Sequence, residues 1–139
     1  MSSLLQLCAA IPGLKQKGMR EIEKPVRGVT CDSRACGPGF VFVALRGEKT
    51  DGHRYVADAV ARGCLAAVIE DDSGLPEGLP LIKVADSHHA YGLMAAEFYG
   101  HPAGGMKIVG LTGTNGKTTT SWIIEPVSYT HLRAHETKA

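Results

Sequence analysis

The segment GTNGKTT at residues 113–119 has the residue types of a loop that binds the phosphates of a nucleotide. Glycines let the backbone curl so that several N–H groups point at phosphate oxygens, and a helix that follows adds the positive end of its dipole. Lys117 would supply a full positive charge to the β- and γ-phosphates, and the Thr118 hydroxyl would join the shell of a Mg²⁺. We therefore predict that ATP and Mg²⁺ bind here, with Lys117 as the catalytic residue and Thr118 as the magnesium ligand. The predicted nucleotide-binding residues are Gly113, Thr114, Asn115, Gly116, Lys117, Thr118 and Thr119.

The match to the general phosphate-loop pattern is incomplete at one position. That pattern has a glycine six residues before the lysine, where this chain has Leu111. The Gly-Lys-Thr core is intact, and the apolar run KIVGLT at 107–112 predicts a buried strand that leads into the loop. An ordinary turn before a helix would also explain the Gly-Lys-Thr triplet, but the strand before it favours phosphate binding.

The composition is that of a folded domain with a sizeable apolar core. The chain has 139 residues, 44% of them hydrophobic, and a formal net charge of +1. A charge so close to zero argues against nucleic acid or a membrane surface as a partner, and no apolar run approaches the ~20 residues of a membrane span. No CxxC pair occurs, which favours reduced thiols over a zinc site or a disulfide framework. The cysteines are Cys8, Cys31, Cys36 and Cys64.

Alternating strand and helix signals predict an α/β fold around this core. Apolar runs of strand length indicate strands that are buried on both faces. The segment between two of them places Tyr55, Val56, Ala59 and Val60 on one helical face, so that a parallel strand pair with a right-handed crossover is expected. Strands are predicted from residue 28, at 40–45, at 65–70, at 81–84 and at 107–112, and helices near the N-terminus, at 54–63 and from 86 or 87 to 99.

Two segments together resemble a known family. TGTNGKTTT, at 112–120, resembles the ATP loop of the Mur ligases, the ATP-dependent amide ligases of peptidoglycan synthesis. CDSRACGPGFVFVALRGEKTDGHRYVADAVARG, at 31–63, resembles their N-terminal domain. Thr114 and Asn115 favour the members that add the third peptide residue, because the members that add D-alanyl-D-alanine usually have a serine in this loop.

The resemblance implies a substrate and a reaction. The substrate would be UDP-N-acetylmuramoyl-L-alanyl-D-glutamate, held by Cys31 and Ser33 and by a second loop at Glu48, Lys49 and Thr50. ATP would phosphorylate the D-glutamate carboxylate, and the amine of diaminopimelate or lysine would attack the acyl phosphate. The family also implies a cytoplasmic protein, and we expect a monomer that binds neither nucleic acid nor membrane.

The same resemblance suggests how the chain is divided. We predict a small N-terminal α/β substrate domain at 1–87, then a linker helix and the first strand, phosphate loop and helix of a truncated ATPase domain at 88–125. The tail at 126–139 matches nothing expected of a Mur ligase and begins with a helix-breaking proline. It resembles translated adapter sequence, so we expect a non-native tail and an inactive fragment.

Each motif also has a simpler interpretation. Taken alone, Asp32, Ser33 and Arg34 are typical of a capped turn, and the residues at 48–51 are typical of a solvated charged loop. His53 alone is more typical of a structural histidine at a helix start than of a catalyst. Two other functions stay open: a ligase of the family that adds D-alanyl-D-alanine, and a stand-alone module that binds a nucleotide-sugar.

Overall fold

A computed structural model describes residues 2–18, 22–47, 50–108, 110 and 112–124. The chain divides into two compact units, Met1–Gly104 and Gly105–Ala139, and each is considered by itself below. The predictions for Glu48, Lys49 and the tail at 126–139 concern residues outside those that the structure describes. No helix in the described part of the chain is long and apolar enough to cross a membrane.

The first unit is built on a five-stranded sheet with the order β1-β5-β4-β3-β2. Strands β2, β3, β4 and β5 run parallel to one another. The outer strand β1 pairs with β5 in the antiparallel direction. The strands are β1 (Lys15–Lys17), β2 (Gly28–Thr30), β3 (Phe40–Val43), β4 (Ala66–Ile69) and β5 (Leu81–Lys83). The parallel pairing of β3 and β4 confirms the predicted strand–helix–strand unit.

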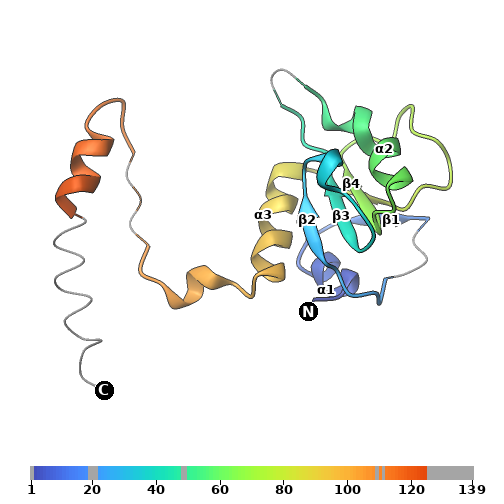
Figure 1. The fold of residues 1–139 in the computed structure, drawn as a ribbon, viewed down its shortest axis with the longest axis horizontal. Helices are drawn as coiled ribbons and strands as arrows, with labels where there is room; N and C mark the ends of the chain where they lie inside the picture. Colours follow the sequence, from blue (N-terminus) through green and yellow to red (C-terminus); the bar gives the residue numbers. More distant parts are fainter. Residues whose placement is uncertain (1, 19–21, 48–49, 109, 111, 125–139) are drawn as a thin grey trace. The chain divides into compact units, whose positions relative to one another are not determined.

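Helices cover both faces of this sheet (Figure 1). Successive side chains of a strand point to opposite faces, so the wholly apolar strands β3 and β4 need cover on each side. Helices α1 (Leu4–Ala9) and α3 (Ser87–Phe98) belong to one side, and α2 (Val56–Ala61) to the other. One core includes Leu4, Leu7, Val41, Val43, Val68, Ile82 and Met94. The other includes Phe42, Ala44, Val56, Ala59, Ala67, Ile69 and Leu81.

Local capping fixes where the helices begin. Ser3 and Gln6 form a reciprocal capping box at the start of α1, which satisfies two backbone donors that would otherwise lack partners. The Asp86 carboxylate accepts a hydrogen bond from the backbone N–H of His89, so Asp86 is the N-cap of α3, one of the two caps expected. These caps, together with α2, confirm the three helices predicted for this part of the chain.

Helix α3 packs within the first unit, against α1 and β2. The sequence assigned this helix to the linker after residue 87, whereas the compact unit runs on to Gly104. The domain limits at 87 and 125 stay predictions for the intact protein. Short 3₁₀ helices at Ser33–Ala35 (η1), Gly52–Tyr55 (η2) and Pro102–Gly105 (η3) complete the elements of this region.

In the second unit, residues 117–124 are helical and follow the glycine-containing loop, as the sequence predicts. The buried strand predicted at 107–112 is wrong for the residues that the structure describes. Residues 107, 108, 110 and 112 have no strand structure and are exposed, and Ile108 keeps 69% of its surface accessible. A strand needs a neighbour to pair its backbone groups and cover its side chains, and the described residues of this unit supply none.

Candidate functional site

The residues that the sequence connects with a nucleotide-sugar follow the carboxyl ends of parallel strands. Strand β2 ends at Thr30, immediately before Cys31 and Ser33, and β3 ends at Val43, shortly before the loop that contains Thr50. Because parallel strands end at the same edge of a sheet, these segments lie along one edge of the first unit. In open α/β sheets this edge is where ligands bind.

The segment after β2 is a short capped turn. Asp32 is the N-cap of η1, and its carboxylate accepts a hydrogen bond of 2.9 Å from the backbone N–H of Arg34. The Arg34 guanidinium also donates two hydrogen bonds to the same carboxylate, of 3.0 and 2.8 Å. This pairing lowers the pKa of Asp32 to about 2. The side chains of Asp32 and Arg34 are therefore paired with each other. Ser33, between them in the turn, is buried, with 9% of its surface exposed.

A hollow of about 440 Å³ opens beside this turn. Cys31 and Ser33, both predicted to bind substrate, line it together with Tyr55 and Asp58, which the sequence did not single out. Tyr55 was expected on the buried face of a helix; instead it ends η2 and keeps 44% of its surface exposed. An exposed ring beside hydroxyl and backbone groups can stack on a nucleobase while those groups make hydrogen bonds. The hollow's lining is completed by Asp32 and Arg34.

The second predicted substrate segment is a tight loop at the end of β3. Arg46 and Asp51 form an isolated antiparallel bridge, and the Gly47 N–H donates to the Thr50 carbonyl at 3.0 Å. The Gly52 N–H then donates to the carbonyl of Leu45 at 2.8 Å. Thr50 itself is exposed. The two ends of the loop are therefore joined by backbone hydrogen bonds at the carboxyl edge of the sheet.

A polar cluster lies under this loop, where β4 ends and α3 begins. The Arg46 guanidinium is 3.8 to 3.9 Å from carboxylates of Asp51, Glu70 and Asp71. The Glu70 carboxylate accepts hydrogen bonds from the backbone N–H and the hydroxyl of the buried Ser87, at 2.8 and 2.7 Å. These two donors lower the pKa of Glu70 and keep its carboxylate charged. The cluster joins the loop, β4 and α3 at the edge of the sheet.

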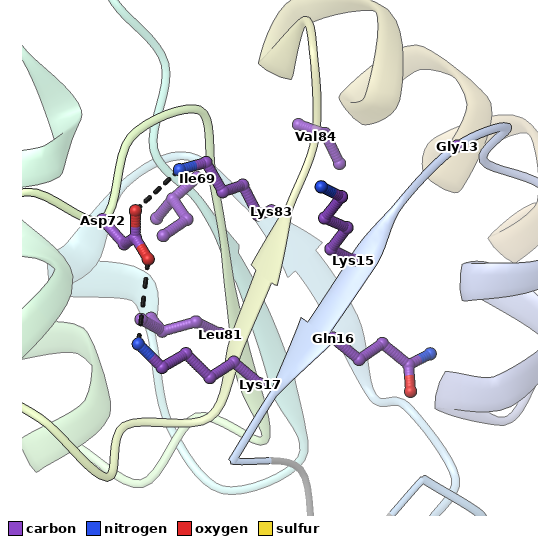
Figure 2. Close-up of a pocket in the computed structure, with 9 residues that line it drawn as sticks. All are labelled: Gly13, Lys15, Gln16, Lys17, Ile69, Asp72, Leu81, Lys83 and Val84. Atoms are coloured by element: carbon purple, nitrogen blue, oxygen red, sulfur yellow. Dashed lines mark hydrogen bonds and ion pairs between the residues drawn. The ribbon is translucent and has the colours of Figure 1, made fainter.

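A larger hollow, of about 480 Å³, lies beside β1, the outer strand at the other side of the sheet from β2 (Figure 2). Its apolar floor includes Ile69 and Leu81, and its rim carries Lys15, Lys17 and Lys83. The Asp72 carboxylate lies between two of these ammonium groups, 2.6 Å from Lys83 and 3.8 Å from Lys17. None of the predicted site residues lines this hollow, so its greater volume does not make it the substrate site. The other lining residues are Gly13, Gln16 and Val84.

The predicted phosphate loop lies in the second unit and has the backbone that its glycines permit. Gly113 and Gly116 adopt φ values of +144° and +81°, which residues with a Cβ rarely adopt. The Lys117 ammonium donates a hydrogen bond to the Gly113 carbonyl, so its charge lies across the loop. Thr114, Asn115, Thr118 and Thr119 are exposed. The loop therefore offers backbone donors, one cation and hydroxyl groups to a ligand, which fits a nucleotide phosphate with its Mg²⁺.

A preformed metal site is absent from the part of the chain that the structure describes. No group of three or more His, Cys, Asp or Glu side chains there is arranged to hold a metal ion. The donors near the loop are instead hydroxyls such as that of Thr118. Such a group would hold Mg²⁺ only together with the phosphates of a nucleotide.

Residues 25–99, more than half of the chain, match the Mur ligase family, catalytic domain. The chain belongs to the Mur ligase family. The match begins just before β2 and extends beyond the end of α3, so it includes the turn after β2, the loop after β3 and the polar cluster where β4 ends and α3 begins.

Two of the similar proteins share the name of one ligase. The chain is 49% identical over 102 residues to the UDP-N-acetylmuramoyl-L-alanyl-D-glutamate--2,6-diaminopimelate ligase of Geobacter metallireducens, covering 73% of this chain and 20% of that protein. It is 41% identical over 124 residues to the enzyme of the same name from Chlorobium phaeobacteroides, covering 88% of this chain and 24% of that one. The chain thus spans about a fifth to a quarter of the length of these relatives.

Solved structures of a sister ligase have a similar fold. The UDP-N-acetylmuramoylalanyl-D-glutamyl-2,6-diaminopimelate--D-alanyl-D-alanyl ligase of Acinetobacter baumannii matches 91% of this chain and 27% of its own, with a TM-score of 0.67 and 29% identity. The MurF ligase of Thermotoga maritima, in complex with ADP, matches 69% and 22%, with a TM-score of 0.51 and 28% identity. The family and the α/β fold expected from the sequence are confirmed.

Proposed function

We propose that the first unit holds the nucleotide-sugar substrate of a ligase that adds the third peptide residue to UDP-N-acetylmuramoyl-L-alanyl-D-glutamate. The observation that carries this proposal is the 49% identity to a 2,6-diaminopimelate ligase over 102 residues. The family match over residues 25–99 includes the hollow beside Cys31 and Ser33. The nucleotide would lie in that hollow, with the Tyr55 ring against the base and the loop at Thr50 against the sugar or phosphates.

The phosphate loop serves the second substrate. ATP, bound with Mg²⁺, would transfer its γ-phosphoryl group to the D-glutamate carboxylate and leave as ADP. The incoming amine would then attack the acyl phosphate and expel phosphate to form the amide. Backbone N–H groups of residues 113–116 would bind the phosphates, Lys117 would neutralise charge on the transferred group, and Thr118 would be a magnesium ligand. This reaction belongs to the cytoplasm, where its nucleotide substrates are made.

Residues 1–139 alone should bind without catalysing ligation. Rate enhancement of this kind depends on holding ATP and the carboxylate in one orientation, and that needs a loop fixed by its surroundings. All described residues from 110 to 123 are exposed, so none is fixed by packing. A purified chain that formed amide product above background would contradict this proposal.

A second candidate is the ligase that adds D-alanyl-D-alanine, because the solved structures with a similar fold are of that type. Their identity is 29% and 28%, against 49% for the diaminopimelate ligase, so we favour the third-residue enzyme. A stand-alone nucleotide-sugar module is the third possibility. Reading the genomic frame past codon 125 distinguishes it from the two ligases, since only they require a continuing ligase sequence.

Two experiments test the proposal. Isothermal titration of the chain with UDP-N-acetylmuramoyl-L-alanyl-D-glutamate should give saturable binding, whereas the muramoyl dipeptide without the nucleotide should bind far more weakly. The protein encoded by the continuous frame should then ligate diaminopimelate or lysine to that substrate. Transfer of D-alanyl-D-alanine to the tripeptide instead would assign the protein to the second candidate.

A further inference from the structure

His53 makes hydrogen bonds on both sides of its ring. Its Nδ1 lies 2.6 Å from Oδ1 of Asp51, and its Nε2 lies 3.0 Å from the backbone nitrogen of Glu70 and 3.4 Å from that of Asp71. The side chain is largely buried, with 11% of its surface exposed. Asp51 closes the loop after β3, and Glu70 and Asp71 follow β4, so the ring joins two segments that are 17 residues apart.

The chemistry of these partners fixes the tautomer of the ring. Backbone N–H groups only donate, so Nε2 must be the unprotonated nitrogen that accepts from Glu70 and Asp71. The ring hydrogen is then on Nδ1, where it is donated to the Asp51 carboxylate. Asp51 also accepts a hydrogen bond of 2.9 Å from the backbone N–H of His53. The carboxylate is thus held by two donors from the same residue.

The neighbouring contacts of the loop are weaker or more exposed. The Arg46 guanidinium approaches its three carboxylates only to 3.8 to 3.9 Å, and its side chain is 51% exposed. His88 contacts the Arg46 carbonyl at 3.1 Å, but it is an exposed residue of α3. Exposed pairs at such distances contribute little to holding a segment in place. The partly buried bonds of His53, at 2.6 Å to Asp51 and 3.0 Å to the N–H of Glu70, are therefore the main side-chain link between the loop and β4.

We propose that His53 is a positioning residue for the nucleotide-sugar: its ring anchors Asp51, at the end of the loop after β3, to the end of β4 and so sets where the neighbouring Thr50 meets the ligand. This inference rests on the proposed function of the first unit. His53 itself need not touch the substrate. Its role differs from that of a general base, because both ring nitrogens already have partners within the fold.

Two substitutions test separately the hydrogen bond of Nδ1 to Asp51 and those of Nε2 to the N–H groups of Glu70 and Asp71. In His53→Asn the side-chain amide reaches the position of Nδ1 and can still donate to Asp51, but it cannot reach the N–H groups of Glu70 and Asp71. In His53→Gln the amide oxygen reaches the position of Nε2 and can accept from those N–H groups, but the bond to Asp51 is lost. His89→Gln is the matched control, because His89 is exposed and its ring makes no hydrogen bond within the described residues.

The first readout needs no ligand. Long-range ¹H–¹⁵N correlation spectra of the wild-type chain should show the hydrogen of the His53 ring on Nδ1 and not on Nε2. Amide hydrogen exchange at Gly47 and Gly52 should rise roughly tenfold in both His53 variants, while exchange at Ala44, whose N–H bonds to Val68 within the sheet, stays unchanged. A ring hydrogen on Nε2, or unchanged exchange at the glycines, would overturn the inference.

The second readout is the dissociation constant for UDP-N-acetylmuramoyl-L-alanyl-D-glutamate. Both His53 variants should bind roughly tenfold more weakly than the wild type, and His89→Gln should bind equally well. Wild-type binding with unchanged affinity in the His53 variants would refute the positioning role and leave the proposed function intact. No binding by a folded wild-type chain would refute the proposed function, and the positioning role with it.

Discussion

Gly52 is the position where a single added methyl group should disturb the fold most directly at the substrate edge. A Cβ at this position would lie 2.8 Å from the backbone nitrogen and oxygen of Leu45 and 3.0 Å from the Cα of Ala44. These atoms belong to the backbone that continues from β3, so they cannot rotate away as a flexible side chain would. We therefore expect Gly52→Ala to force the loop away from the end of β3.

The magnitude follows from two contributions. Overpacking against a fixed neighbour costs about 1–3 kcal/mol, and loss of the 2.8 Å hydrogen bond from Gly52 to Leu45 costs about 1 kcal/mol more. Because the loop can relieve part of the clash by moving outward, we expect a decrease of about 2–3 kcal/mol in the free energy of unfolding. That is a large fraction of the stability of a small domain.

Urea denaturation followed by far-ultraviolet circular dichroism measures this change. Trp122, the single tryptophan, lies in the second unit and is 74% exposed, so its fluorescence would not report on the sheet. Gly92→Ala is the control: Gly92 lies in α3 with nothing within 4 Å of an added Cβ, and the change should stabilise by up to about 1 kcal/mol. If the two variants unfold within about 0.5 kcal/mol of each other, the close approach at Gly52 is not what the structure indicates.

Three further predictions concern the polar cluster, the thiols and the tail. Ser87→Ala should lower stability at pH 7 by about 1–2 kcal/mol, because Glu70 loses a hydroxyl donor. The pKa of Glu70 is lower in the folded than in the unfolded chain, so this contribution is present above the unfolded pKa and is lost as pH falls through the folded one; urea melts from pH 7 to pH 3 should show the difference disappear. Dithiobis(nitrobenzoate) should label Cys31 quickly and the three buried cysteines slowly, since burial raises the pKa of Cys64 to about 12; rapid labelling of all the thiols would contradict the packing. Deleting residues 126–139 should leave the unfolding free energy unchanged within about 0.5 kcal/mol, because the buried residues of the described chain lie between Leu4 and Met94; a clear loss in thermal or urea melts would show that the tail belongs to the fold.

The buried strands were predictable because their sequences admit few other structures. The run at 40–45 is apolar at every position but short, which suits a central strand covered on both faces. Strand β1 was not predicted, since Lys15, Gln16 and Lys17 are polar and exposed and are held by backbone pairing with β5. The run at 107–112 shows the opposite case: its apolar pattern indicates burial, yet the residues described there are exposed. An apolar pattern indicates that a segment is stable when other residues cover it, but it does not show that those residues are present.

The candidate site was predictable only in part, for a related reason. Cys31 and Ser33 were predicted as substrate-binding residues through a resemblance between short motifs, and both line one hollow. Tyr55 was missed because helical spacing assigned it to a core, although it lies before the first turn of α2. The link from His53 to Glu70 spans 17 residues and depends on how two strands end side by side, which no local pattern records. The proposed contacts of Glu48 and Lys49 with the substrate stay predictions.

The central claim is that the nucleotide-sugar binds at the carboxyl edge of the sheet, and chemical-shift mapping tests it most directly. Backbone ¹H–¹⁵N spectra of the chain should be followed during titration with UDP-N-acetylmuramoyl-L-alanyl-D-glutamate. We expect the largest shifts at Cys31, Ser33, Thr50 and Tyr55. Shifts concentrated at Lys15, Lys17 and Lys83 would place the ligand in the hollow beside β1 instead and contradict the account.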